Sequence, residues 1–486
     1  MKKLTFAIAT CFCLILSSSA NAQTKRSQRM MTYDDIMALK TVGGTAISPD
    51  GKQALYTVSF ADMKENERRA EIWIAPTEKG ADGGQNAKPR RFTSGKNDNS
   101  PQWAPDGQTI AFISTRGAGE AAKPQVYLIS AFGGEAEKLT DSKTGVNSFV
   151  WSQDSKRIAY VAQRPLTEAE EKKQKDKDDA QVVDSGFRFT HLWVIDVNST
   201  ASATGSGERA KASEIVKNDW VVSDPQFSPD GKRLSFTAHP TPKADDGSLG
   251  DIYIANSDGS GSPRKLYGNA GPDSSARWSP DGKWISFSSR DAKMGTLGFQ
   301  RLYVVSAEGG APRAVAPNYD NSVPPVVWSR DGSTLYFAAS SRTTSQIFSV
   351  PAAGGEVKTV SSGDAVISGV SFARNADKVA FARSDIQRPA DVYVSSLSNF
   401  NPSKLTDHNQ QLNDIALGRG EVVRWKSKDG MEIEGVLVYP VNYEAGKRYP
   451  TIANIHGGPS GVWTQAFPGS HGNYAHIWAG KGWMVF

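Results

Sequence analysis

The sequence predicts a mainly β protein: a seven-bladed β-propeller followed by a short α/β segment. Three observations support this prediction. A hydrophobic residue followed by Ser-Pro-Asp-Gly-Lys, or by a degenerate copy of it, occurs seven times along the chain. Each copy leads into a short apolar stretch, and the repeat stops after Phe400. Repeats of about 50 residues are typical of propellers and solenoids, and they decide the fold class before any other feature.

The first 22 residues resemble a secretory signal. Two lysines precede the apolar run 4–16, and small residues follow up to Ala22. The run is too short to span a bilayer. Cleavage after Ala22 would remove both cysteines, Cys11 and Cys13. We therefore expect an exported protein, periplasmic or extracellular, that does not span the membrane and forms no disulfide.

Residues 23–42 are expected to form a linker with a short helix before the first repeat. Thr32 is followed three residues later by Asp35, which is the spacing of a capping box at a helix start.

Each repeat is centred on a turn. The proline presets φ for the second turn position, the aspartate bonds to nearby backbone, and the glycine accepts positive φ, so each copy predicts a β-hairpin. The Asp residues of these turns, such as Asp50, Asp230 and Asp281, suggest metal ligands, but turn geometry alone explains them and we predict no metal site. The copies are anchored at Ser48, Ala104, Ser152, Ser228, Ser279, Ser329 and Ala373, with spacings of 56, 48, 76, 51, 50 and 44 residues.

A second apolar phrase follows about fifteen residues after several turns, as in Asp251-Ile-Tyr-Ile-Ala255 and Arg301-Leu-Tyr-Val-Val305. Two hairpins in each repeat give four strands, which is one propeller blade. A solenoid would need helices or single strands in each repeat, and no long helical periodicity appears between Gly43 and Phe400. We therefore assign residues 43–417 to the propeller.

The longest spacing contains a stretch of mixed charge at residues 167–180. It is expected to form a solvated loop or an exposed helix. A second hypothesis is that Glu168, Glu170 or Glu171 binds the amino terminus of a peptide substrate.

Residues 418–486 follow a different pattern. Two strands are predicted around the turn Lys428-Asp429-Gly430, and an apolar strand at 451–455 leads into His456-Gly-Gly-Pro-Ser-Gly461. A helix is expected near residues 473–480 and a parallel strand at 482–486. A buried strand that enters a glycine loop is how an α/β-hydrolase positions backbone N–H groups to receive an oxyanion.

This order of features resembles the prolyl oligopeptidase family, and within it the bacterial dipeptidyl and acylaminoacyl peptidases. The resemblance covers nearly all of the mature chain. It rests on an exported chain, a propeller, and the opening of a hydrolase domain with Asp-Gly, Tyr-Pro and His-Gly-Gly-Pro. It implies a serine peptidase for short peptides that needs no cofactor. By position, the amides around Gly457 and Gly458 would stabilise the tetrahedral intermediate, and His456 would shape the loop without acting as the triad base.

The chain departs from the family in one respect. No Gly-x-Ser-x-Gly occurs in the 486 residues, and the catalytic serine, aspartate and histidine of the family come after the glycine loop. Ser460 lies within that loop and does not replace them. We expect an incomplete α/β-hydrolase domain, and hence a fragment that is inactive as given.

The competing hypothesis is a non-enzymatic periplasmic propeller that binds other proteins, as in the Tol system. Such a protein has no need of residues 418–461. The six histidines lack the spacing of a metalloprotease site. The formal net charge is +5 and the basic residues are scattered, which argues against a nucleic-acid partner.

Overall fold

Strands dominate the computed structural model, which describes residues 28–78, 88–116, 122–180, 182–197, 211–291, 293, 298–458, 461–470 and 472–486. The predicted signal at residues 1–22 lies outside these ranges. The helices of the described residues are short: α1 (Tyr33–Met37), α2 (Glu168–Lys175), α4 (Ala475–Gly480) and the 3-10 helices η3 (Asp245–Leu249) and η5 (Gln410–Asp414). The fold is therefore mainly β, as predicted.

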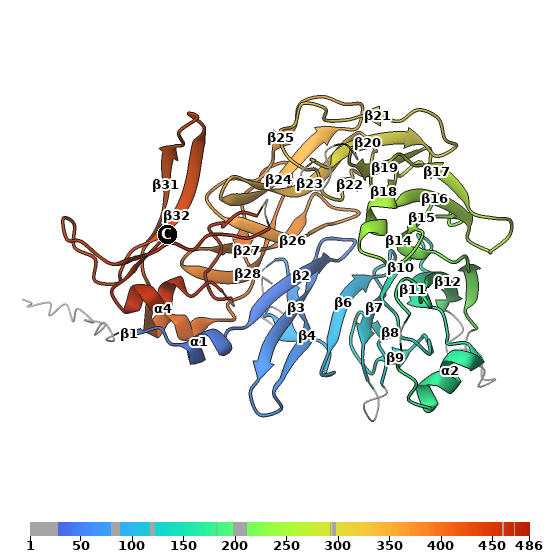
Figure 1. The fold of residues 1–486 in the computed structure, drawn as a ribbon, viewed down its shortest axis with the longest axis horizontal. Coiled ribbons are helices and arrows are strands. Elements are labelled where there is room, and N and C mark those ends of the chain that lie inside the picture. The colour runs from blue at the N-terminus through green and yellow to red at the C-terminus, as the bar shows by residue number, and fades with distance from the viewer. Residues whose placement is uncertain are drawn as a thin grey trace, which may run out of the picture.

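From β2 to β29, consecutive strands form antiparallel groups of four, which follow one another around a ring in Figure 1. Single bridges, Thr190 to Val221 and Ser345 to Val366, join neighbouring groups in two places. The groups are β2 (Thr41–Ile47), β3 (Gln53–Asp62), β4 (Glu67–Pro76), β5 (Arg90–Arg91); β6 (Asp98–Trp103), β7 (Thr109–Ser114), β8 (Gln125–Ser130), β9 (Glu137–Lys138); β10 (Ser148–Trp151), β11 (Arg157–Gln163), β12 (Thr190–Asp196), β13 (Ser213–Val216); β14 (Val221–Phe227), β15 (Arg233–His239), β16 (Asp251–Asn256), β17 (Arg264–Tyr267); β18 (Asp273–Trp278), β19 (Trp284–Ser289), β20 (Arg301–Ser306), β21 (Arg313–Ala314); β22 (Val327–Trp328), β23 (Thr334–Ser341), β24 (Thr344–Pro351), β25 (Lys358–Thr359); and β26 (Val366–Phe372), β27 (Val379–Asp385), β28 (Arg388–Ser395), β29 (Ser403–Lys404).

The repeated turns join the first and second strands of each group, and the predicted hairpins are confirmed. At Ser279 the hydroxyl donates to Asp281 Oδ1 at 2.6 Å, and the same carboxylate oxygen accepts from Lys283 N at 3.1 Å. Gly282 N donates to Ser279 O at 2.9 Å, and Gly282 has φ +70°. The bond from the serine hydroxyl to the turn aspartate recurs at Ser48, Ser152, Ser228 and Ser329, so these aspartates are used within their own turns. The copies at Ala104 and Ala373 lack the hydroxyl.

One aromatic ring in each group marks the centre of the core. It lies on the second strand, eight residues after the turn anchor, where it is buried between neighbouring groups. The third strand contributes a ring beside it, as where Phe337 and Phe348 stack with centroids 5.4 Å apart. The second-strand rings are Tyr56, Phe112, Tyr160, Phe236, Phe287, Phe337 and Phe381.

A β-bulge interrupts the first strand in five of the groups. The bulged residue has positive φ and lies four residues before the turn anchor, and the register shifts there. The extra residue bends the strand and changes the direction of its last residues. The residues are Gly44, Ser100, Asp224, Ser275 and Gly369.

The ring closes where the first group packs against the last. Among the described residues the two groups share no strand, and each is built from its own consecutive segment. Thr45 Oγ1 donates to Gly369 O at 2.6 Å, and Asn375 N donates to Pro49 O at 2.8 Å. Tyr56 and Val392 belong to one apolar cluster that spans the joint. Closure therefore depends on side chains and single hydrogen bonds.

The amino-terminal end of the described chain packs against the segment that follows the last group of strands. The predicted capping box is confirmed: Thr32 caps α1, and Asp35 accepts from Thr32 N at 2.8 Å. The hydrogen bond from Arg29 is the main reason why the pKa of Asp35 falls to about 2. β1 (Arg29–Met30) pairs in parallel with β30 (Ile415–Ala416). The amino-terminal segment thus packs against the chain that leaves the last group.

Residues 420–486 form a four-stranded sheet with the order β31-β32-β34-β33, packed with α4. β31 (Gly420–Lys426) and β32 (Glu432–Val438) make the predicted hairpin, and β33 (Thr451–Ile452) is parallel to β34 (Met484–Val485), as predicted. In Figure 1 the β31–β32 hairpin projects away from the ring.

The carboxy-terminal sheet contacts the ring at two turns. Arg342, between β23 and β24, forms ion pairs with Glu432 at 2.7 Å and Glu434 at 2.9 Å. Between β27 and β28, Gln387 Nε2 donates to Gly418 O at 2.6 Å. Both turns link a second strand to a third, so the sheet lies on one side of the ring.

Candidate functional site

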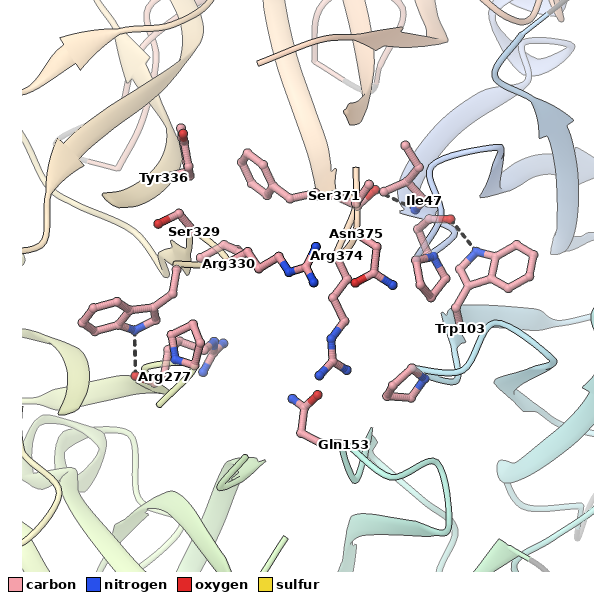
Figure 2. Close-up of a pocket in the computed structure, with 18 of the residues that line it drawn as sticks. Ile47, Trp103, Gln153, Arg277, Ser329, Arg330, Tyr336, Ser371, Arg374 and Asn375 are labelled. Carbon is pink, nitrogen blue, oxygen red and sulfur yellow. Dashed lines mark hydrogen bonds between the residues drawn. The ribbon is translucent and has the colours of Figure 1, made fainter. Parts of the chain in front are cut away.

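A cavity of about 1010 Å³ lies at the centre of the ring, where the first strands and their turns converge (Figure 2). The residue that follows each turn anchor lines it, and all copies of the repeat contribute one. These residues are Pro49, Pro105, Gln153, Pro229, Pro280, Arg330 and Arg374. The repeat therefore determines both the sheets and the wall of the cavity.

The positions just before the turn anchors supply large apolar side chains to the same wall. Trp103, Trp278 and Trp328 belong to it, and their indole N–H groups donate to carbonyls of the preceding group. Trp103 Nε1 donates to Ala46 O at 2.9 Å, and Trp328 Nε1 donates to Arg277 O at 3.0 Å. The rings are thus fixed in position by their polar ends.

Two of the four charged side chains of the wall have partners. Arg277 bonds to Asp224 at 2.7 Å, and Asp377 accepts from Ser396 Oγ at 2.6 Å. Arg330 and Arg374 differ, since neither pairs with a carboxylate in the described part of the chain, and Figure 2 shows both pointing into the cavity. Burial, and next the positive charge of Arg330, lower the pKa of Arg374.

A second candidate site is the loop at His456, Gly457 and Gly458, directly after β33. Gly458 has φ +140°, a conformation that favours glycine, and all three residues are exposed. Among the described residues no acceptor is found for the N–H of Gly457 or of Gly458. His456 Nδ1 lies 3.3 Å from Gly457 O. Two neighbouring free amides are what an oxyanion-binding loop requires.

The strand before this loop differs from the prediction. An apolar, buried strand is expected at 451–455, but only Thr451 and Ile452 form it, and Ile455 is 86% exposed. The reason is that β33 lies at the edge of its sheet, where it pairs only with β34. Ser460 lies outside the described residues.

The acidic candidates lie elsewhere. Glu168, Glu170 and Glu171 start α2, an exposed helix on the far side of the ring from α4 in Figure 1. Glu170 binds Arg164 through two bonds of 2.7 Å and caps the helix, and the Arg164 bond is the main reason why its pKa falls to about 2. The structure does not bring these glutamates to the glycine loop, and their role in substrate binding stays a prediction.

Sequence reasoning did not identify the arginine pair. The signal is present in the repeat itself, because two degenerate copies have arginine where four others have proline. A comparison of the copies, position by position, would have found it.

No protein-family model matches the sequence. The chain is 25% identical over 451 residues to dipeptidyl-peptidase 5 of Porphyromonas gingivalis, which covers 90% of this chain and 64% of that protein. It is also 25% identical over 454 residues to the uncharacterized peptidase YuxL of Bacillus subtilis, covering 89% of this chain and 67% of the relative. The chain thus spans about two thirds of the length of these relatives.

Solved structures agree with this relationship. Acylaminoacyl peptidase of Pyrococcus horikoshii superposes with a TM-score of 0.71 at 19% identity, over 94% of this chain and 66% of that one. The chain is related to serine peptidases of the prolyl oligopeptidase family. The β-propeller domain of the Trilobed protease from Pyrococcus furiosus, at a TM-score of 0.52 and 18% identity, covers 76% of this chain and 99% of that one. These likenesses show a β-propeller fold.

The prolyl oligopeptidase relationship bears on the competing hypothesis. Both of these relatives are named as peptidases, so a purely protein-binding propeller is not favoured. In the described part of the chain, no helix has both the length and the apolar character needed to cross a membrane.

Proposed function

We propose that this chain forms the propeller and the first part of the catalytic domain of an exported serine peptidase that acts on short peptides. The observation that carries the proposal is the glycine loop, in which the amides of Gly457 and Gly458 have no acceptor among the described residues and follow a sheet docked to the ring. Similarity to peptidases over 90% of the chain supports it.

In this proposal the groups of four strands are the blades of one seven-bladed propeller over residues 43–417. Residues 418–486 are the opening of an α/β-hydrolase domain, and residues 1–22 direct export to the periplasm or beyond. The ring admits short peptides to its cavity and excludes folded proteins, since the wall is formed by every copy of the repeat.

Hydrolysis follows the acyl-transfer route of serine peptidases. A serine attacks the scissile carbonyl, and the amides of Gly457 and Gly458 donate to the oxygen that becomes negative in the tetrahedral intermediate. The serine, its acid and its base are supplied by residues other than these 486, which contain no Gly-x-Ser-x-Gly. The 486-residue chain alone is therefore inactive.

The deciding experiment is to read the source DNA downstream of the Phe486 codon and to express the product of the open frame. An open frame with a Gly-x-Ser-x-Gly, then Asp and His, is expected, and its product should release amine from short peptide substrates. Substrates that release a dipeptide or an acylated amino acid would distinguish the two activities. A stop codon directly after Phe486 would overturn the proposal.

The role of the loop is tested in the same product with Gly457→Pro, which removes one N–H donor. We expect kcat to fall about 10²-fold to 10³-fold, the usual loss for one oxyanion donor, with a smaller change in KM. Ile455→Ala is the control, because it alters an exposed neighbour and keeps every amide. An equal loss in both variants would mean that the loop acts only through its fold.

A further inference from the structure

Arg330 and Arg374 occupy a turn position where four other copies have proline. Proline presets φ at this position and favours the turn. Arg330 offers no such advantage, yet its turn forms in the same way, with Ser329 Oγ donating to Asp331 at 2.6 Å. The turn therefore does not explain why Arg330 and Arg374 stand there.

The wall of the central cavity has more positive than negative side chains. The charged residues found in the wall are Arg277, Arg330, Arg374 and Asp377. Arg277 is paired with Asp224, and Asp377 accepts hydrogen bonds from Ser396 and Ser398. Arg330 and Arg374 form no ion pair among the described residues, so the cationic groups of the wall outnumber its anionic ones. Two like charges that face the same cavity repel each other unless an anion joins them; burial, and next the charge of Arg330, lower the pKa of Arg374.

The rest of the wall suits a peptide. Indole rings come from the second, fifth and sixth groups, while amide side chains such as Gln153 and Asn375 stand beside the arginines in Figure 2. Apolar surface with a few polar groups is typical of small-molecule sites, and a cavity of about 1010 Å³ has room for several residues of peptide.

We propose that Arg330 and Arg374 bind a carboxylate of a peptide that enters the central cavity. A guanidinium group donates two parallel hydrogen bonds to a carboxylate, which makes arginine the fitting side chain for this task. The carboxylate comes from the C-terminus of the peptide or from an Asp or Glu side chain. That the ligand is a peptide rests on the function proposed above, whereas the preference for an anion rests on the cavity alone.

The test measures binding to the 486-residue chain, so it does not depend on catalysis. Tryptophan fluorescence is the readout, because Trp103, Trp278 and Trp328 line the cavity. The probes are acetyl-tetraalanine with a free or an amidated C-terminus, and acetyl-Ala-Ala-Glu-Ala-amide with its Gln counterpart. We expect the carboxylate form of at least one pair to bind about tenfold more tightly than the neutral form, and which pair responds identifies the source.

The variants are Arg330→Gln, Arg374→Gln and the double substitution, which keep hydrogen-bonding capacity and remove charge. In the double variant, the carboxylate form of the peptide should bind less than twofold more tightly than the neutral form. Arg68→Gln is the matched control, since Arg68 is exposed on β4 outside the cavity, and it should leave the preference unchanged. Raising the salt concentration should weaken the preference in the unmodified chain.

Equal or absent binding of charged and neutral peptides by the unmodified chain would overturn the proposal, and that comparison needs no variant. A preference that survives in the double variant would also overturn it. Inorganic phosphate is titrated in parallel, and binding of phosphate without any peptide preference would contradict a peptide site. None of these results affects the search for the catalytic serine, so the two proposals can fail separately.

Discussion

His476 shows how a single buried side chain joins the carboxy-terminal sheet to the ring. It lies on α4 with no exposed surface, and its Nε2–H donates to Ile386 O at 2.7 Å. Nδ1 has no partner among the described residues. Burial lowers the pKa of His476 to about 4, because a charged imidazolium here would lose its hydration.

This contact should make the docking of α4 depend on pH. The pKa of an unfolded histidine is about 6.5, so the folded state disfavours the protonated form. The contribution of neutral His476 to stability is complete above pH 6.5 and is lost as the pH falls toward 4, with about 2 kcal/mol lost at pH 5. Hydrogen exchange of the α4 amides at pH 7 and pH 5, corrected for intrinsic rates, measures the loss. In His476→Gln, which keeps a donor and cannot titrate, the difference should disappear; an unchanged difference would assign it to another group.

At the scale of the element, an indole ties three of the groups of strands to the preceding group, through Trp103, Trp278 and Trp328. Trp278 Nε1 donates to Gln226 O at 3.2 Å, and Trp328 Nε1 lies 3.0 Å from both Arg277 O and Ser286 Oγ. The acceptors belong to the preceding group in each case. These bonds link sheets that exchange few backbone hydrogen bonds, so they resist sliding of one group past the next.

We expect Trp328→Phe to lower the free energy of unfolding by about 1 kcal/mol more than Trp193→Phe. Both substitutions remove similar ring area, but only Trp328 has a hydrogen bond to lose, since the buried Nε1 of Trp193 has no partner. Urea unfolding of the two variants gives the comparison. Equal losses would show that the indole bonds contribute little beyond packing.

The elements that the sequence predicts well are those with local causes. The turn at Ser279 and the hairpin around Gly430 depend on residues within a few positions of each other, so the residue spacing alone is sufficient to predict them. The bulge at Ser275 was not predicted, because serine gives no sign of its positive φ. The strand expected at 451–455 ends at Ile452, because its length depends on which strands pair with it and not on its own residues alone. Arg330 and Arg374 are 44 residues apart in the sequence. They can be predicted to lie together only by aligning the copies of the repeat, because each follows a turn anchor.

For the whole molecule, closure of the ring depends on contacts between the first and the last group of strands. The first and last groups meet through Thr45, Ser371 and Gly369 and through the apolar cluster around Tyr56. At Gly369 the backbones come so close that a Cβ would lie 2.9 Å from Gly44 N. The two strands therefore fit together only without a side chain at this position.

Gly369→Ala should consequently open the joint. Positive φ costs an alanine about 1 to 2 kcal/mol, and overpacking against backbone adds about 1 to 3 kcal/mol. Gly363→Ala is the matched control: Gly363 also has positive φ, at +90°, but its Cβ would meet only the end of the Arg383 side chain at 3.7 Å. We expect the free energy of unfolding to fall by about 1 kcal/mol or more beyond the control, and amide protection in β2 and β26 to fall first. If both variants lose equal stability and β2 stays protected, then the joint tolerates separation and the ring is held by the other contacts between its groups.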